Sequence, residues 1–145
     1  MLVIWAPLTL LTSLAAWIDA RREVIPNTLS LVAASIGIGL LLGHQIAWTA
    51  LLWAGGMWLV YEFGNWVQPD RVGWGDAKWS AITMGYLGGL GLLVIAAGFC
   101  GSVIWGTVRW WKAGRSARWQ TYGGPWAPGA WVGLLMIGGL RLWHG

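Results

Sequence analysis

Apolar residues in this chain of 145 residues gather into long uncharged runs. The runs cover residues 2–18, 28–43, 46–61 and 79–108, followed by a stretch that begins at 113 or 119 and reaches 140 with few interruptions. At a rise of about 1.5 Å per residue, a helix of about 17 to 20 residues crosses a hydrocarbon core of about 30 Å. The pattern therefore predicts helices that span a membrane.

The run 79–108 is too long for one span of ordinary tilt. The glycine-rich segment 88–91 interrupts it, so we expect two short helices joined at the glycines. The first of the two would be short if it began at Trp79, and we expect it to begin nearer Asp76. Together the runs predict an all-α fold of six transmembrane helices, forming a single domain over residues 1–145.

Composition supports a lipid environment. Hydrophobic residues make up 57% of the chain and charged residues only 10%, whereas soluble domains carry about 25% charged residues. A cleavable signal peptide would require basic residues before its apolar run, and none precedes the first run here. We therefore expect the first span not to be cleaved off. The lone cysteine, Cys100, lies in an apolar run and is expected to be buried. Many of the 15 tryptophans flank the runs and fit an aromatic belt, among them Trp17, Trp48, Trp66, Trp79, Trp110, Trp111 and Trp143.

Basic residues define the orientation. If the six spans alternate in direction, one face holds the loops around 19–27, 62–78 and 109–121. These loops carry Arg21, Arg22, Arg71, Lys78, Arg109, Lys112, Arg115 and Arg118, and only Arg141 lies opposite. Because Lys and Arg in short loops mark the cytoplasmic side, we expect the N-terminus outside. The net charge of +4 then reflects topological anchors, and we expect no nucleic-acid partner.

The acidic residues number five and all lie on the same predicted face: Asp19, Glu23, Glu62, Asp70 and Asp76. Asp19 directly follows the first apolar run, and an ionisable group at that depth is a candidate for function. The simpler interpretation is a carboxylate that reaches water beside Arg21 or Arg22. Asp76 follows two glycines just before an apolar helix, where the simpler interpretation is an ordinary helix cap.

Asp19 and Asp76 are more informative as a pair, because they come from different helices and reach one membrane face at similar depth. Two carboxyls in contact share a proton, and such a pair can hydrolyse a peptide bond. The ionised member takes a proton from water, and the protonated member polarises the carbonyl group. His44 and His144 fall on the opposite side by this topology, so no metal site or Ser-His-Asp arrangement is expected.

Two motifs in the chain resemble the signatures of type IV prepilin peptidases. Residues 19–27 read Asp-Ala-Arg-Arg-Glu-Val-Ile-Pro-Asn, similar to an aspartate followed by a basic stretch and Ile-Pro-Asn. Residues 73–78 read Gly-Trp-Gly-Asp-Ala-Lys, similar to the second signature, Gly-x-Gly-Asp-x-Lys. A looser third likeness, to a Pro-Tyr-Gly segment, begins at Tyr122, where Thr121 replaces the usual proline and Pro125 and Pro128 are additional.

The resemblance implies a multi-pass aspartic endopeptidase of the bacterial inner membrane, with six helices and its active site facing the cytoplasm. Its substrates would be prepilins or pseudopilins, whose basic leader is cut just before a hydrophobic helix, often after glycine. Asp19 and Asp76 would be the catalytic acids. The supporting loops would comprise Ile25, Pro26, Asn27, Gly73, Gly75 and Lys78. Candidate substrate-binding residues are Glu62, Tyr122 and Gly123.

Larger members of this family also carry a cysteine-rich cytosolic segment and methylate the new pilin terminus with S-adenosylmethionine. This chain lacks that segment and resembles the short form, so methylation stays open, and the peptidase reaction itself calls for no cofactor or metal. Presenilin-like proteases are less similar because they expect a Tyr-Asp pair, whereas Ile18 precedes Asp19. The alternative in another class is a non-catalytic membrane protein that uses the two carboxylates to transport protons or cations.

Overall fold

The computed structural model describes residues 2–67, 73–113 and 125–144, and this part of the chain is helical throughout apart from short connections. Its elements are α1 (Leu2–Arg22), α2 (Asn27–Leu42), α3 (Thr49–Val67), α4 (Trp74–Leu87), the 3₁₀ turn η1 (Gly88–Leu90), α5 (Gly91–Lys112) and α6 (Ala127–His144). No strand occurs within these ranges. The predicted all-α class is confirmed.

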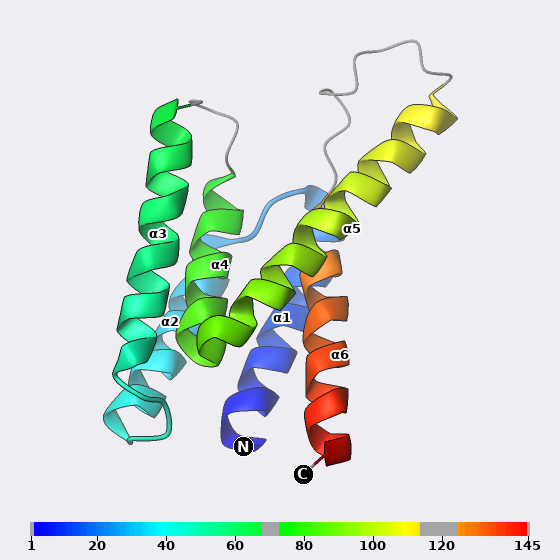
Figure 1. Cartoon of the computed structure of the whole chain (residues 1–145). Coiled ribbons are helices and arrows are strands. Elements are labelled where there is room, and N and C mark those ends of the chain that lie inside the picture. Colours follow the sequence, from blue (N-terminus) through cyan, green and yellow to red (C-terminus); the bar gives the residue numbers. More distant parts are fainter. Residues whose placement is uncertain (1, 68–72, 114–124, 145) are drawn as a thin grey trace.

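Successive helices run in opposite directions, and both termini lie at one end of the bundle (Figure 1). The turn between α4 and α5 agrees with the predicted break, because Gly88 adopts a φ of +57°, which glycine tolerates best. The expected early start of α4 is also confirmed, since the helix begins at Trp74, ahead of Asp76. The ends of α1 and α3 therefore share one end of the bundle with the starts of α4 and α6.

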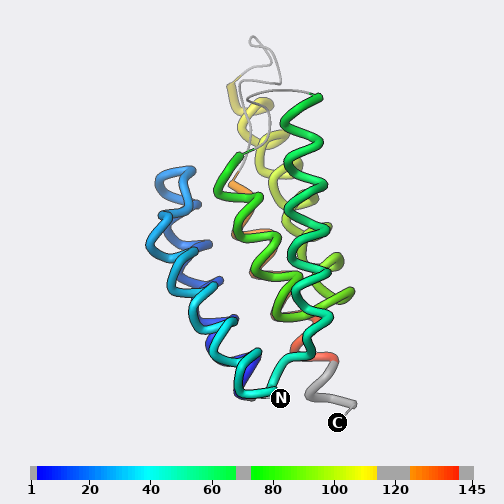
Figure 2. Tube along the Cα trace, turned by 90° about the vertical axis from the view of Figure 1, so that its left-hand side faces the viewer, coloured from blue at the N-terminus to red at the C-terminus, as the bar shows by residue number. Residues whose placement is uncertain are grey.

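The helices form two groups that meet at α4. In one group α6 packs against both α1 and α5, and in the other α4 lies between α2 and α3 (Figure 2). Glycines permit the closest crossing, between α5 and α6. A Cβ atom on Gly129 would lie 2.5 Å from the carbonyl oxygen of Ala97, and one on Gly98 would lie 2.4 Å from the indole of Trp126. Small residues allow such backbone contact between helices in lipid.

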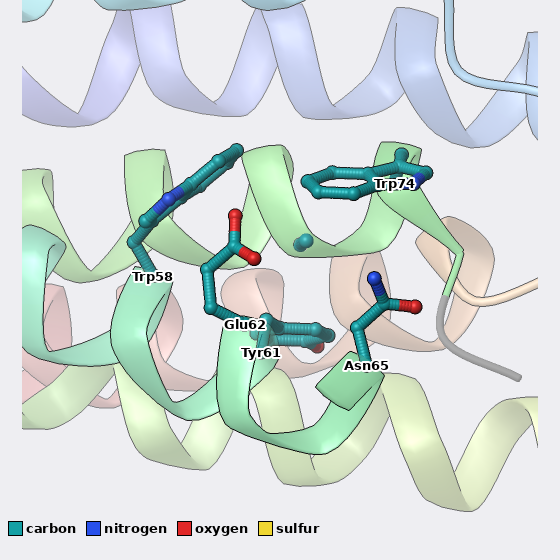
Figure 3. Close-up of a pocket in the computed structure, with 6 residues that line it drawn as sticks. Trp58, Tyr61, Glu62, Asn65 and Trp74 are labelled. Carbon is teal, nitrogen blue, oxygen red and sulfur yellow. The ribbon is translucent and has the colours of Figure 1, made fainter. Parts of the chain in front are cut away.

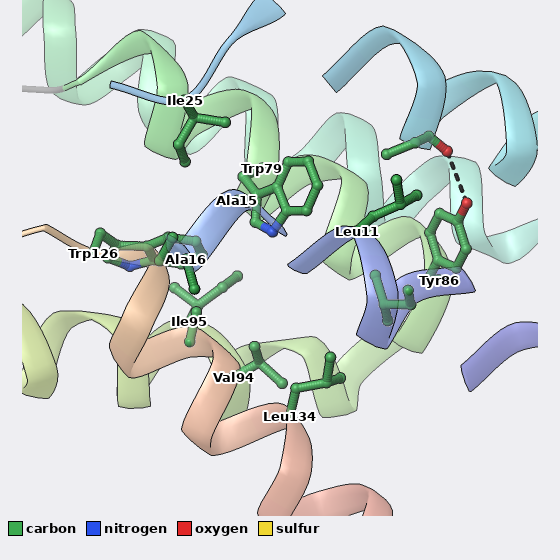
Figure 4. Packing of buried hydrophobic residues seen from close by; sticks show 14 of the residues in the cluster. Leu11, Ala15, Ala16, Ile25, Trp79, Tyr86, Val94, Ile95, Trp126 and Leu134 are labelled. Carbon is green, nitrogen blue, oxygen red and sulfur yellow. Dashed lines mark hydrogen bonds between the residues drawn. The ribbon is translucent and has the colours of Figure 1, made fainter. Parts of the chain in front are cut away.

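The core lies where α1, α4, α5 and α6 meet, around the indole of Trp79 (Figure 4). Trp79 is wholly buried, so its predicted place in an interfacial aromatic belt is wrong. A hydrogen bond from the Tyr86 hydroxyl to the carbonyl oxygen of Ala33, at 2.7 Å, ties α4 to α2. Trp17, Trp48 and Trp66 are exposed near helix ends, as a belt requires.

Two helical stretches have the length and apolar composition needed to cross a membrane, Val3–Arg22 and Trp74–Lys112, and the second contains the turn η1. Asn27–Leu42 and Ala127–Leu140 are shorter apolar helices. Large apolar side chains also remain exposed on the outside of the bundle, for example Leu31, Leu52 and Ile104. Soluble proteins rarely expose this much apolar surface, so these features indicate a membrane protein. Cys100 is exposed on α5, so the expectation of a buried thiol is wrong.

Candidate active site

Asp19 lies in the last turn of α1 and points into the bundle. Its side chain is only 4% exposed, and its Oδ2 accepts a hydrogen bond of 2.9 Å from the backbone N–H of Ala127, the first residue of α6. The guanidinium group of Arg21 lies instead over the ring of Trp17, 4.4 Å from its centroid. The geometry therefore disfavours the simpler interpretation, in which Asp19 turns toward Arg21 and water.

The contact with α6 has a local cause. The first N–H groups of a helix have no partner within the helix and need an outside acceptor. The residues before Ala127 read Gly-Gly-Pro-Trp and contain no Ser, Thr, Asp or Asn to cap it. The carboxylate of Asp19 takes this role from another helix, and the negative charge also suits the positive end of the helix dipole.

Asp76 lies in the first turn of α4, three residues after the extended residue Gly73. No side chain caps α4 at Gly73, so Asp76 does not act as the ordinary cap that the simpler interpretation required. Both glycines of the motif allow close approach. A Cβ atom on Gly73 would lie 3.1 Å from Oδ2 of Asp76, and one on Gly75 would lie 3.3 Å from Cβ of Ile25.

The two aspartates line one open cavity of about 430 Å³ at the end of the bundle where α1 ends and α4 begins. The helices α1 and α4 touch only over a small area. The cavity is completed by the loop after α1, the glycines before Asp76 and the start of α6, through Glu23, Val24, Ile25, Gly73, Trp74, Gly75, Pro125 and Trp126.

The two predicted motifs are linked directly. Nζ of Lys78 donates a hydrogen bond of 2.7 Å to Oδ1 of Asn27, and the buried Ile25 packs against Gly75. Pro26 has the extended conformation that starts α2. The supporting residues predicted from sequence therefore join the loop after Asp19 to the helix that carries Asp76.

A second contact holds the loop after α1 to α5. The carboxylate of Glu23 forms an ion pair with Arg109 near the end of α5. Glu23 itself adopts a φ of +53°, in the left-handed region that non-glycine residues rarely enter. No role was assigned to Glu23 from the sequence, and the separation of Glu23 from Arg109 in sequence does not predict their ion pair.

Of the candidate substrate-binding residues, Glu62 is the one that the structure describes, and it does not line the cavity of the aspartates. Glu62 lines a separate small cavity between α3 and α4 (Figure 3), and Trp74 lines both cavities. Tyr122 and Gly123 lie outside the described residues. The sequence prediction missed Trp74, Trp126 and Ala127. The missing cap before α6 is the only signal that pointed to Ala127.

Within the ranges that the structure describes, no group of three or more His, Cys, Asp or Glu side chains could hold a metal ion. His44 lies in the connection between α2 and α3, at the end of the bundle opposite the aspartates (Figure 1). No protein-family model matches the chain, and no curated protein or solved structure shows significant similarity to it.

Proposed function

We propose that the chain is a membrane aspartic endopeptidase that removes the basic leader from prepilin-like proteins. The observation that carries this proposal is that Asp19 and Asp76, from different helices, line one cavity. The resemblance of both aspartate motifs to those of type IV prepilin peptidases narrows the substrate class. The contacts between Lys78 and Asn27 and between Gly75 and Ile25 add support, because they make the two motifs parts of one site.

We assign the two carboxyls different roles. Two adjacent carboxyls share one proton, because both cannot be ionised cheaply. Asp19 accepts an N–H bond at the positive end of α6, which favours negative charge on Asp19 and leaves the shared proton on Asp76. In the reaction, Asp19 takes a proton from the attacking water. Asp76 donates its proton to the peptide carbonyl oxygen as the water oxygen bonds to the carbonyl carbon. The C–N bond then breaks, the leaving amine takes the proton that Asp19 removed from water, and the hydroxyl formed on the carbonyl oxygen returns its proton to Asp76.

The proposal includes six membrane spans with the N-terminus outside and the aspartates at the cytoplasmic face. Described basic residues at the aspartate end of the bundle support this orientation, namely Arg21, Arg22, Lys78, Arg109 and Lys112. Hydrophobic helices of prepilins or pseudopilins would reach the open cavity from the bilayer of a bacterial inner membrane. Reporter fusions to the N-terminus and to the loop near His44 test the orientation, and a cytoplasmic N-terminus would contradict it.

The test is leader cleavage in cells that co-express the chain with a prepilin. We expect the parent to shorten the substrate, and we expect Asp19→Asn and Asp76→Asn each to reduce cleavage by about 10²–10⁴-fold, as loss of a general acid or base does. His44→Gln, at the far end of the bundle, serves as the matched control and should cleave like the parent. Full cleavage by either Asn variant would refute the paired-acid mechanism.

A second candidate is transport of protons or cations through the bundle. It is favoured by buried hydroxyl groups in the core that have no hydrogen-bond partner in the described structure, on Thr12, Ser30 and Thr83. Water bound at such groups could extend a polar path from Asp19. Acidification of proteoliposomes that contain the parent, but not Asp19→Asn, together with no cleavage of any prepilin, would favour this candidate over the peptidase.

A further inference from the structure

A compact cluster between α3 and the start of α4 combines one acid with two indole rings. Trp58 and Glu62 belong to α3, and Trp74 belongs to α4. The centroids of the two indoles lie 5.9 Å apart, with the rings tilted by 44°. Figure 3 shows the Glu62 carboxylate between the two rings, with the Asn65 amide below Trp74. We call Trp58, Glu62, Asn65 and Trp74 the indole-acid box.

The carboxylate of Glu62 lacks a partner of its own. It is only partly exposed, and within the described residues neither a hydrogen bond nor an ion pair reaches it. The nearby hydroxyl of Tyr61 is occupied by Ser80, at 2.9 Å. Partial burial of a carboxylate without a hydrogen-bond donor costs free energy, and a bound cation would offset this cost.

The rings favour the same kind of ligand. The faces of indole attract an ammonium or guanidinium group within about 6 Å of the ring centroid. The amide oxygen of Asn65 offers one more acceptor for N–H groups. Acid, aromatic faces and amide together match an organic cation that carries several N–H donors, as Lys and Arg side chains do.

The interior of the box restricts how such a group binds. It has a volume of about 10 Å³, enough for about one water molecule. The cationic group therefore binds at the mouth, over the carboxylate and the exposed ring of Trp74, which is 50% exposed. A charged group on a long flexible stem suits this position, because the stem can lie along the apolar surface while the charge reaches Glu62.

Trp74 connects the box to the aspartates, because its side chain lines both cavities. Ala77 lines the box and Asp76 lines the other cavity, so the two cavities lie on different sides of α4, and a ligand that reaches both must cross about one helix width, roughly 10 Å. An extended peptide covers about 3.3 Å per residue. The two sites are therefore separated by about three residues of extended substrate.

We propose that the indole-acid box is a substrate subsite that binds one Lys or Arg side chain of the leader, about three residues before the cleaved bond. The proposal rests on the proposed peptidase function and specifies its substrate. It assigns recognition of the leader to one defined contact with Glu62, rather than to the general attraction between a basic peptide and an acidic face.

The test measures peptide binding separately from cleavage. Fluorescein-labelled peptides carry a single Lys at one of six positions before a glycine and a short apolar segment, with Gln at the other positions. They are titrated against the Asp76→Asn protein in neutral maltoside micelles, and fluorescence anisotropy gives each Kd. We expect Glu62→Gln to weaken about tenfold the one peptide whose Lys lies about three residues before the cut, and to change the Kd of the others, including an all-Gln peptide, by less than about twofold.

Two further variants separate ring effects from a general loss of structure. Trp74→Phe keeps an aromatic face and should lose less affinity for that peptide than Trp74→Leu does. Trp66→Leu removes a tryptophan from the same end of α3, where Trp66 is 78% exposed and lies outside the box. We expect this control to leave every Kd unchanged.

Equal weakening of all peptides by Glu62→Gln, or no weakening, would overturn the subsite. It would leave the peptidase standing if the parent still cuts these peptides and Asp19→Asn does not. Failure of every peptide to bind or be cut would reject both proposals.

Two other occupants of the indole-acid box would also overturn the subsite. One is a lipid amine, shown if a short-chain phosphatidylethanolamine binds in a Glu62-dependent way while no peptide does. The other is the chain's own Arg71. This occupant would be shown if the parent binds all the peptides equally and Arg71→Gln binds the peptide whose Lys lies about three residues before the cut more tightly than the others.

Discussion

Replacement of Asp19 by alanine and by asparagine separates its structural role from its chemical role. The buried carboxylate accepts the N–H of Ala127 at 2.9 Å, and the sequence before α6 supplies no other cap. Loss of a helix cap costs about 0.5–2 kcal/mol, and a buried N–H left without an acceptor costs about 1–3 kcal/mol. Both ranges describe the same lost bond. We therefore expect Asp19→Ala to lower the free energy of unfolding by about 1–3 kcal/mol.

Asparagine preserves the geometry, because its amide oxygen can accept the same N–H bond. It removes the interaction of a charge with the start of α6, which is worth about 0.3–1 kcal/mol, and it also removes the cost of burying that charge, since Asp19 is only 4% exposed. The two effects oppose each other, so Asp19→Asn should be about as stable as the parent, and Asp19→Ala should be about 1–2 kcal/mol less stable than Asp19→Asn. Both variants should lose leader cleavage.

Thermal unfolding in detergent micelles, followed by circular dichroism, measures the stability order. A change of 1 kcal/mol shifts Tm by about 2–8 °C for domains of about 60 to 250 residues, so the gap between the two variants is measurable. Equal Tm values for Asp19→Ala and Asp19→Asn would show that the side chain does not hold α6. Cleavage by a well-folded Asp19→Asn protein would separately refute its role as a catalytic base.

The remaining predictions concern the packing around the site. Gly129→Ala should destabilise the bundle by about 1–3 kcal/mol, because the new methyl group would lie 2.5 Å from the carbonyl oxygen of Ala97. Gly139→Ala on the same helix meets no atom within 4 Å and should leave Tm unchanged or slightly raised, so a similar loss in both variants would contradict the close crossing. Tyr86→Phe removes the bond to Ala33 and should lower the free energy of unfolding by about 0.5–1.5 kcal/mol in the same melts.

The helices and their alternating directions could be predicted because long apolar runs and glycine breaks are local signals. The segment 88–91 is an example, since a turn with a positive φ at Gly88 follows from residue type alone. The prediction from the pattern was wrong where packing between distant segments determines which side chains are buried. Trp79 lies near a helix end in sequence, yet the crossing of four helices buries it completely. No local rule distinguishes it from the exposed Trp66.

The site shows the same division. Asp19 and Asp76 could be selected because ionisable groups at the ends of apolar runs are costly and few. Their common cavity could only be expected, since it depends on how α6 and the loop at Ile25 pack against two helices that barely touch. The bond from Ala127 spans 108 positions in sequence, a separation that no periodicity encodes. Glu62 was selected for its charge alone, and only the fold brings Trp58 and Trp74 beside it.

The double role of Asp19 changes how mutational results at this site should be interpreted. Loss of cleavage in Asp19→Ala has two sufficient causes, since the helix cap and the catalytic base disappear together. Within the described structure the carboxylate of Asp76 accepts no hydrogen bond, and the backbone of Asp76 bonds only within α4. Asp76→Ala and Asp76→Asn should therefore be about equally stable. An unequal response at Asp19 and an equal one at Asp76 would therefore identify which carboxyl is fixed by the fold. The fixed carboxyl is the one whose charge the start of α6 stabilises, and this assigns the base to α1 and the acid to α4.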